Sequence, residues 1–299
     1  MVKIHSKNTA PPLKRGDEFI AISISSPLDD ENSLSEGLKV LQGWGLVCRS
    51  SVTQFEPWGY LAGSDDFRYD QLHPKIKTAL IAFTRGGWGA ARLLERPQAW
   101  ENGWLLGFSD ITSILLSRLS EGYDGGIHGP LVTSLGYEPD WSKERLKAIL
   151  FGSSVPELRG EAWVGGRASG PLVAANLTVG THLIGSRHMP NLEGAILILE
   201  DTNEEPYRID RMLTHWRLTG LLTKISGLAF GDFNNCVEEE SNKTKSSFVL
   251  EEVLKERCFD LGIPVIGKLP IGHCCGNAAI PMGRPALIDG NKGTLTICS

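Results

Sequence analysis

Residues 78–119 read TALIAFTRGGWGAARLLERPQAWENGWLLGFSDITSILLSRL, and this stretch decides the fold. Residues 78–84 and 104–107 are short apolar runs of strand-forming character. Each run ends in a loop rich in glycine or serine, and apolar residues at helical spacing follow each loop. Strands that alternate with helices in this order predict a parallel, doubly wound α/β sheet. Such sheets carry their sites at the carboxyl ends of the strands, which here are the two loops.

The alternation extends in both directions and then changes. A predicted strand at 19–25 and a predicted helix at 33–42 precede the stretch. Residues 154–170 are rich in Gly, Ser and Pro, and predict a linker between an N-terminal α/β domain, 1–153, and a β-rich C-terminal domain, 171–299. Further predicted elements are strands at 46–48, 172–178, 194–199, 228–230, 264–266, 286–288 and 294–297, and helices at 141–151, 209–216 and 248–261.

Composition excludes several classes of function. The 299 residues carry a net charge of −5, and no dense basic cluster is present, which argues against nucleic-acid binding. No apolar run of 18 residues occurs and the N-terminus lacks an apolar leader, so we expect a soluble cytoplasmic protein without membrane contact. The six cysteines are scattered without CxxC spacing, so we expect neither a metal site nor a disulfide framework.

The glycine-rich loop 85–90 follows a predicted strand. A dinucleotide fingerprint starting at Gly87 and Gly89 would need a third glycine where Arg92 stands, so we expect no nicotinamide or flavin cofactor. The glycines still allow backbone N–H groups to approach a ligand closely, as in an oxyanion hole. The alternative interpretation is a plain tight turn.

Ser109 lies between a predicted strand and a predicted helix. A serine there can be exposed on a sharp turn as a nucleophile, although Ile111 replaces the last glycine of a GxSxG pattern. The alternative is a helix N-cap, with Asp110 favourable to the helix dipole. A serine nucleophile needs a base and an orienting acid. His128 and His273, both in glycine-flanked loops, are the candidate bases, and the candidate acids are Glu200 and Asp201, which end a predicted strand.

Seven segments, in order along nearly the whole chain, resemble motifs of the LD-carboxypeptidase family of serine peptidases. They are RGGWG (85–89), GFSDIT (107–112), IHGP (127–130), GPLVAANL (170–177), LED (199–201), PYRIDRML (206–213) and LPIGH (269–273). The resemblance implies a triad of Ser109, Glu200 and His273, and an oxyanion hole formed by the backbone N–H groups of Gly87 and Asp110. It also implies an α/β domain followed by a β-rich domain, often in a homodimer.

The family resemblance implies hydrolysis of the LD-peptide bond before the C-terminal D-alanine of a murein tetrapeptide. Some family members instead inactivate microcin C-type aminoacyl nucleotides, but those chains tend to carry a larger insertion between serine and glutamate. The compact spacing of 91 residues between Ser109 and Glu200 favours the murein branch. A non-catalytic peptide-binding protein is a third interpretation. A glutamine amidotransferase is disfavoured, because serine rather than cysteine occupies the turn.

Three positions concern substrate binding. The substrate's terminal carboxylate needs a cation, and Arg85, with Arg208 behind it, is the candidate. Trp88 stands where the family commonly has tyrosine, so the surface that faces the substrate is expected to differ. The pair Cys274-Cys275 after the histidine has no explanation from the sequence.

Overall fold

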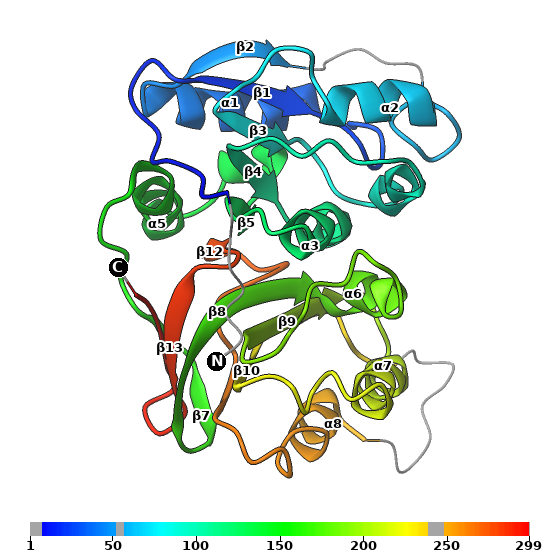
Figure 1. Cartoon of the computed structure of the whole chain (residues 1–299), viewed down its shortest axis with the longest axis vertical. Helices are drawn as coiled ribbons and strands as arrows, with labels where there is room; N and C mark the ends of the chain where they lie inside the picture. Colours follow the sequence, from blue (N-terminus) through cyan, green and yellow to red (C-terminus); the bar gives the residue numbers. More distant parts are fainter. Residues whose placement is uncertain (1–7, 52–56, 239–247, 299) are drawn as a thin grey trace.

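Two β-sheets form the two halves of the molecule in the computed structural model, which describes residues 8–51, 57–238 and 248–298. In Figure 1 the first sheet lies in the upper half and the second in the lower half. Helices cover the sheets. Strands alternate with helices through the first half, whereas the second half also contains runs of strands with no helix between them, at 158–176 and 265–297. In the described residues, no helix is both long enough and apolar enough to span a membrane.

The first sheet is parallel except at one edge. Its strand order is β12-β5-β4-β3-β1-β2, and β12 pairs antiparallel with β5. The strands β1 to β5 lie in the order β5-β4-β3-β1-β2, which confirms the predicted doubly wound sheet. The strands are β1 Glu18–Ile22, β2 Val47–Ser51, β3 Leu80–Phe83, β4 Trp104–Gly107, β5 Gly126–His128 and β12 Ile280–Pro281.

Helices pack on both faces of the first sheet. Asp30 caps the first helix by accepting hydrogen bonds from the backbone N–H groups of Asn32 and Ser33. Gly37 lets that helix approach α4 closely, because a Cβ on Gly37 would lie 1.7 Å from the carbonyl oxygen of Val132. The helices are α1 Glu31–Gly43, α2 Asp65–Leu72, η1 Ala90–Glu95, η2 Ser109–Ile111, α3 Thr112–Ser120, α4 Val132–Leu135 and α5 Asp140–Phe151.

The second sheet has eight strands in the order β6-β14-β13-β8-β9-β10-β11-β7. The long strand β8 pairs antiparallel with β13 along 167–171 and parallel with β9 along 172–176. The β-rich second half is therefore confirmed. Its elements are β6 Leu158–Arg159, β7 Glu161–Val164, β8 Arg167–Asn176, α6 Leu177–Leu183, β9 Ile196–Thr202, α7 Pro206–Leu218, β10 Gly227–Asn234, α8 Leu250–Glu256, β11 Val265–Gly267, β13 Pro285–Asp289 and β14 Thr294–Ile297.

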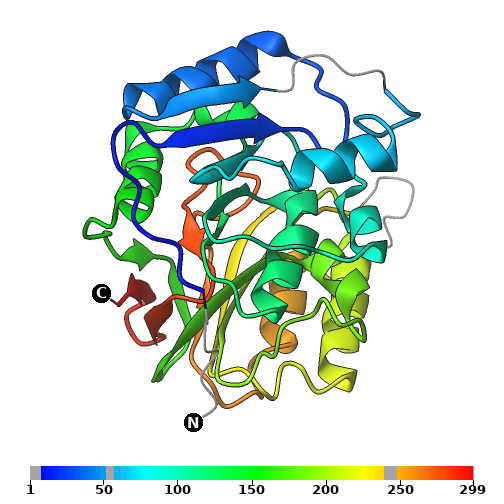
Figure 2. The same cartoon turned by 45° about the horizontal axis from the view of Figure 1, so that its top comes forward.

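The chain crosses between the halves more than once. The segment 154–170 carries β6, β7 and the start of β8, all in the second sheet, and β12 returns to the first sheet from the C-terminal part of the chain. In Figure 2 the orange segment that contains β12 reaches into the N-terminal half. The domain boundaries at 153 and 170 remain a prediction. The loop before β12 connects the two halves, because it starts after β11 of the second sheet and ends at β12 of the first.

Candidate active site

Ser109 follows the carboxyl end of β4 and starts the short helix η2. Its φ angle is +62°, a left-handed conformation that is unusual for a residue other than glycine. Neither η2 nor α3 has a side-chain cap hydrogen bond at its N-terminus, so the alternative that Ser109 is an N-cap is wrong. A serine on a strained turn between a strand and a helix has the backbone of a nucleophile elbow.

The predicted glycine loop lies directly against this serine. A Cβ built on Gly86 would lie 3.1 Å from Cβ and 3.2 Å from Oγ of Ser109, and 3.7 Å from the amide nitrogen of Asp110. Gly87 has φ +106°, and a Cβ on it would lie 2.2 Å from Oγ of Ser26. The glycine at 86 therefore lets the loop backbone pack closely against Ser109, and the glycine at 87 leaves room for the side chain of Ser26.

The carboxylate of Asp110 joins three loops. Its Oδ2 accepts hydrogen bonds from Oγ of Ser25 at 2.6 Å and from the backbone N–H of Ala90 at 2.8 Å. Burial raises the pKa of Asp110, and these two hydrogen bonds act in the opposite direction. The loops after β1, β3 and β4 are thus fixed to one buried group. From the sequence, Asp110 was given a backbone role in the oxyanion hole and, in the alternative interpretation, a favourable interaction with the helix dipole, but not this side-chain role.

Glu200 and His273 meet as the family resemblance implies. Oε2 of Glu200 lies 2.8 Å from Nδ1 of His273, and the Glu200 side chain is 1% exposed. Burial raises the pKa of Glu200, but the imidazoles of His128 and His273 outweigh it and lower that pKa to about 2. Glu200 is therefore a carboxylate at neutral pH, able to orient an imidazole.

The loop that carries His273 is held from both halves. A Cβ on Gly272, whose φ is +110°, would lie 2.6 Å from Oε2 of Glu200. The backbone N–H of Gly272 donates to Oδ1 of Asn277 at 2.9 Å. Oε2 of Glu138, from the first half, accepts from the N–H groups of Gly276 and Asn277, each at 3.0 Å.

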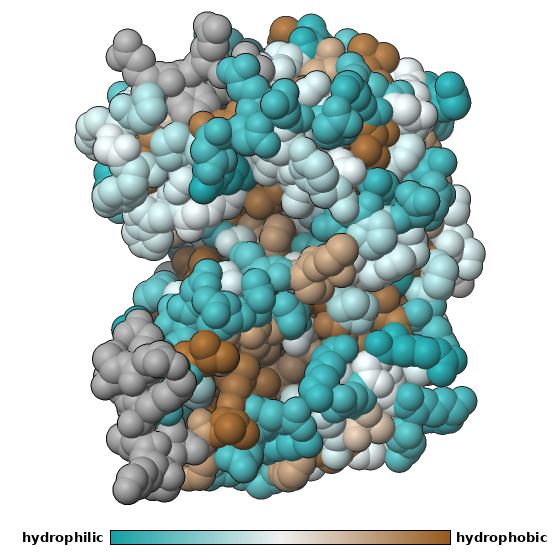
Figure 3. All heavy atoms as spheres, turned by 180° about the vertical axis from the view of Figure 1, so that it is seen from behind, coloured by the Kyte–Doolittle hydropathy of each residue, from teal (hydrophilic) through white to brown (hydrophobic). Residues whose placement is uncertain are grey.

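Phe108 brings the serine loop next to the histidine loop. Its ring centroid lies 4.7 Å from that of His273. Among the described residues, the Ser109 side chain makes no hydrogen bond with His273; the contact between the two loops is made through Phe108. These residues come from both halves of the chain, and Figure 3 shows a hollow with hydrophobic residues on its floor at the boundary between the halves.

Comparison with known proteins then identifies the family. Residues 20–129 match the LD-carboxypeptidase N-terminal domain and residues 169–288 the LD-carboxypeptidase C-terminal domain. A carboxypeptidase-named protein of Synechocystis is 44% identical over 293 residues, 95% of each chain. The chain belongs to the LD-carboxypeptidase family. The family and its carboxypeptidase-named relatives support a serine carboxypeptidase.

Two further comparisons cover both branches of the LD-carboxypeptidase family. The murein tetrapeptide carboxypeptidase of Pseudomonas aeruginosa is 32% identical over 259 residues, which cover 78% of this chain and 80% of the relative. The solved structure of the microcin C7 self-immunity protein MccF, in complex with glutamyl sulfamoyl guanosine, has a TM-score of 0.80 at 21% identity and covers 97% of this chain and 98% of its own. The structural match shows a shared fold.

The position of His128 beside Glu200 was not predicted from the sequence. His128 was a rival candidate for the base, and the structure places its Nε2 3.6 Å from Oε1 of Glu200. Both histidines therefore face one carboxylate, from opposite halves of the chain. The signals for His128 in the sequence were its glycine-flanked position and the family-like segment IHGP (127–130), and neither carried information about Glu200.

A cavity of about 590 Å³ lies beside the histidine loop of the carboxypeptidase. Cys274 and Cys275, which had no explanation from the sequence, line this cavity. Asp232 also lines the cavity and makes no ion pair with any described residue; burial first, and then the charge of Glu200, raise its pKa. Burial raises the pKa of the Cys274 thiol to about 12, so this thiol is not a reactive one.

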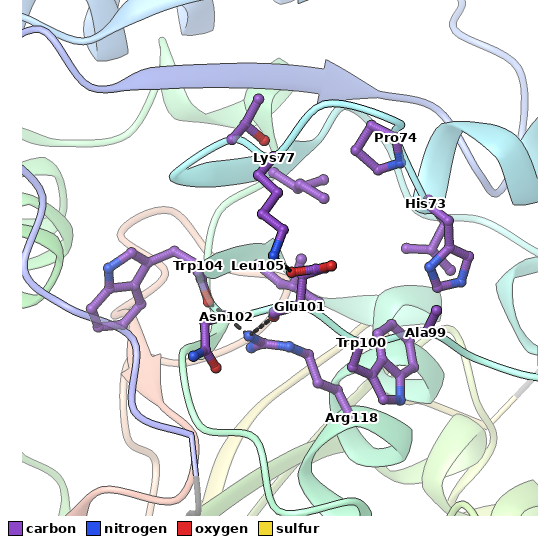
Figure 4. A pocket seen from close by; sticks show the side chains of 14 residues that line it. His73, Pro74, Lys77, Ala99, Trp100, Glu101, Asn102, Trp104, Leu105 and Arg118 are labelled. Carbon is purple, nitrogen blue, oxygen red and sulfur yellow. Dashed lines mark hydrogen bonds and ion pairs between the residues drawn. The ribbon is translucent and has the colours of Figure 1, made fainter.

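A second cavity, of about 170 Å³, lies away from this site (Figure 4). Its lining includes Gly103 and Trp104 at the start of β4, whereas Ser109 follows the end of that strand. Lys77 and Glu101 form an ion pair at this cavity, and Arg118 donates its hydrogen bonds to backbone carbonyls. The cavity therefore lies at the opposite end of β4 from Ser109.

The predicted substrate contacts have other partners in this structure. Nη1 of Arg85, which is partly buried, lies 2.5 Å from Oδ2 of exposed Asp29. Arg208 lies in the first turn of α7, near Glu204 and Glu205. Trp88 is exposed in the glycine loop. The structure thus leaves their role as substrate contacts a prediction.

Proposed function

We propose that this protein hydrolyses the LD-peptide bond before the C-terminal D-alanine of murein tetrapeptides, with Ser109, Glu200 and His273 as its triad. The observation that carries the proposal is the 2.8 Å contact between Glu200 and His273, with Phe108 beside the imidazole and Ser109 next in the chain. The relative named murein tetrapeptide carboxypeptidase supports the substrate class.

The mechanism follows from the roles of these groups. Nδ1–H of His273 donates to Glu200, which leaves Nε2 free to take the proton of Ser109 as its Oγ attacks the carbonyl carbon. The N–H groups of Gly87 and Asp110 stabilise the oxyanion. The imidazolium then protonates the amine of the departing D-alanine. Water, deprotonated by His273, finally hydrolyses the acyl-enzyme and restores the serine. No step requires a metal or a cofactor.

Three side chains complete the proposed substrate site. Arg85 binds the terminal carboxylate, with Arg208 as the reserve candidate, and exposed Trp88 forms part of the wall. The Asp29 carboxylate now paired with Arg85 occupies the place that the substrate carboxylate would take. The cavity beside Cys274 and Cys275 accommodates the portion of the peptide that precedes the D-alanine.

The proposal further places the enzyme in peptidoglycan recycling in the cytoplasm, as a homodimer. Cell fractionation tests the location, and sedimentation of the purified protein tests the dimer. An enzyme found outside the cytoplasm or a monomeric protein would contradict the respective point.

Mass spectrometry of a murein tetrapeptide incubated with the protein tests the reaction itself. We expect loss of one alanine with the wild-type protein, and none with Ser109→Ala or His273→Ala, whose turnover should fall by roughly 10³-fold or more. An aminoacyl sulfamoyl adenylate is the comparison substrate. Cleavage of that compound with the tetrapeptide left intact would assign the protein to the antibiotic-inactivating branch. Binding of the tetrapeptide without cleavage would show a non-catalytic protein.

A further inference from the structure

His128 ends β5 inside the first sheet. Its backbone pairs with Gly107 of β4 on one side and with Ile280 of β12 on the other. The side chain is 0% exposed, and the Phe108 ring packs edge-on against it at 5.7 Å between centroids. Because strands hold both sides of its backbone, His128 presents its ring from a rigid part of the fold.

Three polar atoms without partners meet at this point. Nδ1 and Nε2 of His128 and Oε1 of Glu200 are all buried and make no hydrogen bond within the described part of the chain. Leaving a buried polar group without a partner costs about 1–3 kcal/mol. Nε2 of His128 and Oε1 of Glu200 are 3.6 Å apart, slightly beyond hydrogen-bond distance, so a shift of less than about 1 Å would pair them.

We propose that His128 is a positioning residue, which donates its Nε2–H to Oε1 of Glu200 while Oε2 holds His273. The inference rests on the proposed triad. A carboxylate with a donor on each oxygen cannot rotate freely, so its second oxygen stays directed at Nδ1 of His273. Catalytic hydrogen bonds are often long in an enzyme without substrate and tighten when the substrate binds.

The imidazoles of His128 and His273 are the groups that stabilise the charge of Glu200. Among the described residues, the other titratable groups that interact with the charge of Glu200 are Asp201 on the same strand, Asp232 on β10 and the thiol of Cys274. None of them carries a positive charge. Asp201 is already bound by Asn176 and Thr178. Two further acids near Glu200 disfavour its charge, and two imidazole donors oppose that effect. This explains why a second histidine faces a carboxylate that already has one.

The matched variants are His128→Leu and His128→Gln, which are close to histidine in size. Leucine cannot donate, whereas the glutamine amide can reach Glu200. For His128→Leu we expect turnover to fall by roughly 10- to 100-fold. The acidic limb of the kcat/KM profile should move to higher pH. Without the donor from His128, the charge of Glu200 is less neutralised, so it stabilises the protonated imidazole of His273 more strongly.

His128→Gln should restore most of the turnover and the wild-type acidic limb. Equal turnover of His128→Leu and wild type with an unmoved limb would overturn the proposal. Two variants equally impaired, both with an unmoved limb, would show that His128 serves packing alone. Thermal unfolding shows whether each variant is folded.

A second measurement needs no substrate, and its main readout comes from the wild-type protein. ¹⁵N NMR of histidine-labelled wild-type protein reports which nitrogen of His128 carries the proton. We expect Nε2 to be protonated and its signal to shift in Glu200→Gln. An unprotonated Nε2 would overturn this inference, whereas an uncut murein tetrapeptide would overturn the proposed function, so the two failures are distinguishable.

Discussion

Glu200 and His273, which are 73 residues apart in the sequence, are joined by a 2.8 Å hydrogen bond between a fully buried carboxylate and a half-buried imidazole. Glu200 belongs to β9 of the second sheet, and His273 lies in a loop that continues into β12 of the first sheet. The serine loop meets this pair through Phe108. Packing of the two halves is therefore part of the proposed catalytic geometry.

The buried carboxylate makes stability depend on pH. The pKa of Glu200 is lowered to about 2 from the ordinary value of 4.5, so the folded protein binds this proton less readily than the unfolded chain. Its stabilising contribution is fully present above about pH 4.5 and is lost as the pH falls toward 2. We expect the free energy of unfolding of wild type to decline more steeply between pH 5 and 2 than that of Glu200→Gln. Urea denaturation along this range measures both, and parallel curves would contradict the lowered pKa.

Ser109 carries backbone strain that a glycine would relieve. Its φ of +62° is unfavourable for residues with a Cβ by about 1 kcal/mol. We expect Ser109→Gly to be more stable than Ser109→Ala by about this amount, while both lose roughly 10³-fold or more in turnover. Urea unfolding compares the two variants without interference from the lost hydroxyl, since neither has one. Equal stabilities would show that the turn is not strained.

The sequence predicted the elements of the fold whose signal is local. The strands β1, β3 and β4 are apolar runs bounded by turn residues, and α7 shows apolar residues at helical spacing. The two-residue strand β12 has no such signal, because only its contact with β5 defines it. The start of α6 was not predicted: residues 177 and 178 were assigned to the preceding strand, whereas the cap formed by Asn176 starts the helix there.

The site shows the same division between local and long-range information. The local sequence of Ser109 fits a helix cap as well as a nucleophile, and the φ angle that separates the two depends on the packed turn. Neither His128 nor Glu138 could be placed next to the proposed triad from the sequence. Each reaches its partner across the two halves, and no spacing along the chain encodes that distance.

The close approach of Gly86 to Ser109 can be tested with one methyl group. In Gly86→Ala the new Cβ would lie 3.2 Å from Oγ of Ser109, tighter than most real contacts, and would displace the hydroxyl. We expect turnover to fall by roughly 10- to 100-fold, with the chain still folded. Gly43→Ala is the matched control, since a Cβ there meets nothing within 4 Å. Full activity of Gly86→Ala would separate the glycine loop from the reaction centre.

The pair of Arg85 and Asp29 gives a test of substrate binding. If Arg85 binds the terminal carboxylate, Asp29→Asn removes a competitor and should lower KM, whereas Arg85→Met should raise it, with kcat changing less in both. Arg208→Met is the matched control for the loss of a cation. Steady-state kinetics on a tetrapeptide measure these values. A raised KM in Arg208→Met alone would transfer the role to Arg208.

Glu138 fixes the histidine loop from outside the triad. Its Oε2 accepts two backbone hydrogen bonds, at 3.0 Å each, from Gly276 and Asn277, and Asn277 in turn holds the N–H of Gly272 next to His273. Burial raises the pKa of Glu138, so a neutral side chain that keeps an acceptor should serve almost as well. Glu138→Gln should therefore stay near wild type in turnover.

Glu138→Ala leaves both N–H groups without their acceptor, which costs about 1–3 kcal/mol of stability. The loosened loop should misplace His273 and lower kcat by roughly 10- to 100-fold, with faster hydrogen exchange at 272–279. Asp289→Ala is the control. Asp289 is another buried acid, at the end of β13 in the second sheet, and it accepts hydrogen bonds from the backbone N–H groups of Asn291 and Lys292. We expect that control to lose stability and keep kcat, so an equal loss of kcat in both would reduce the role of Glu138 to stability alone.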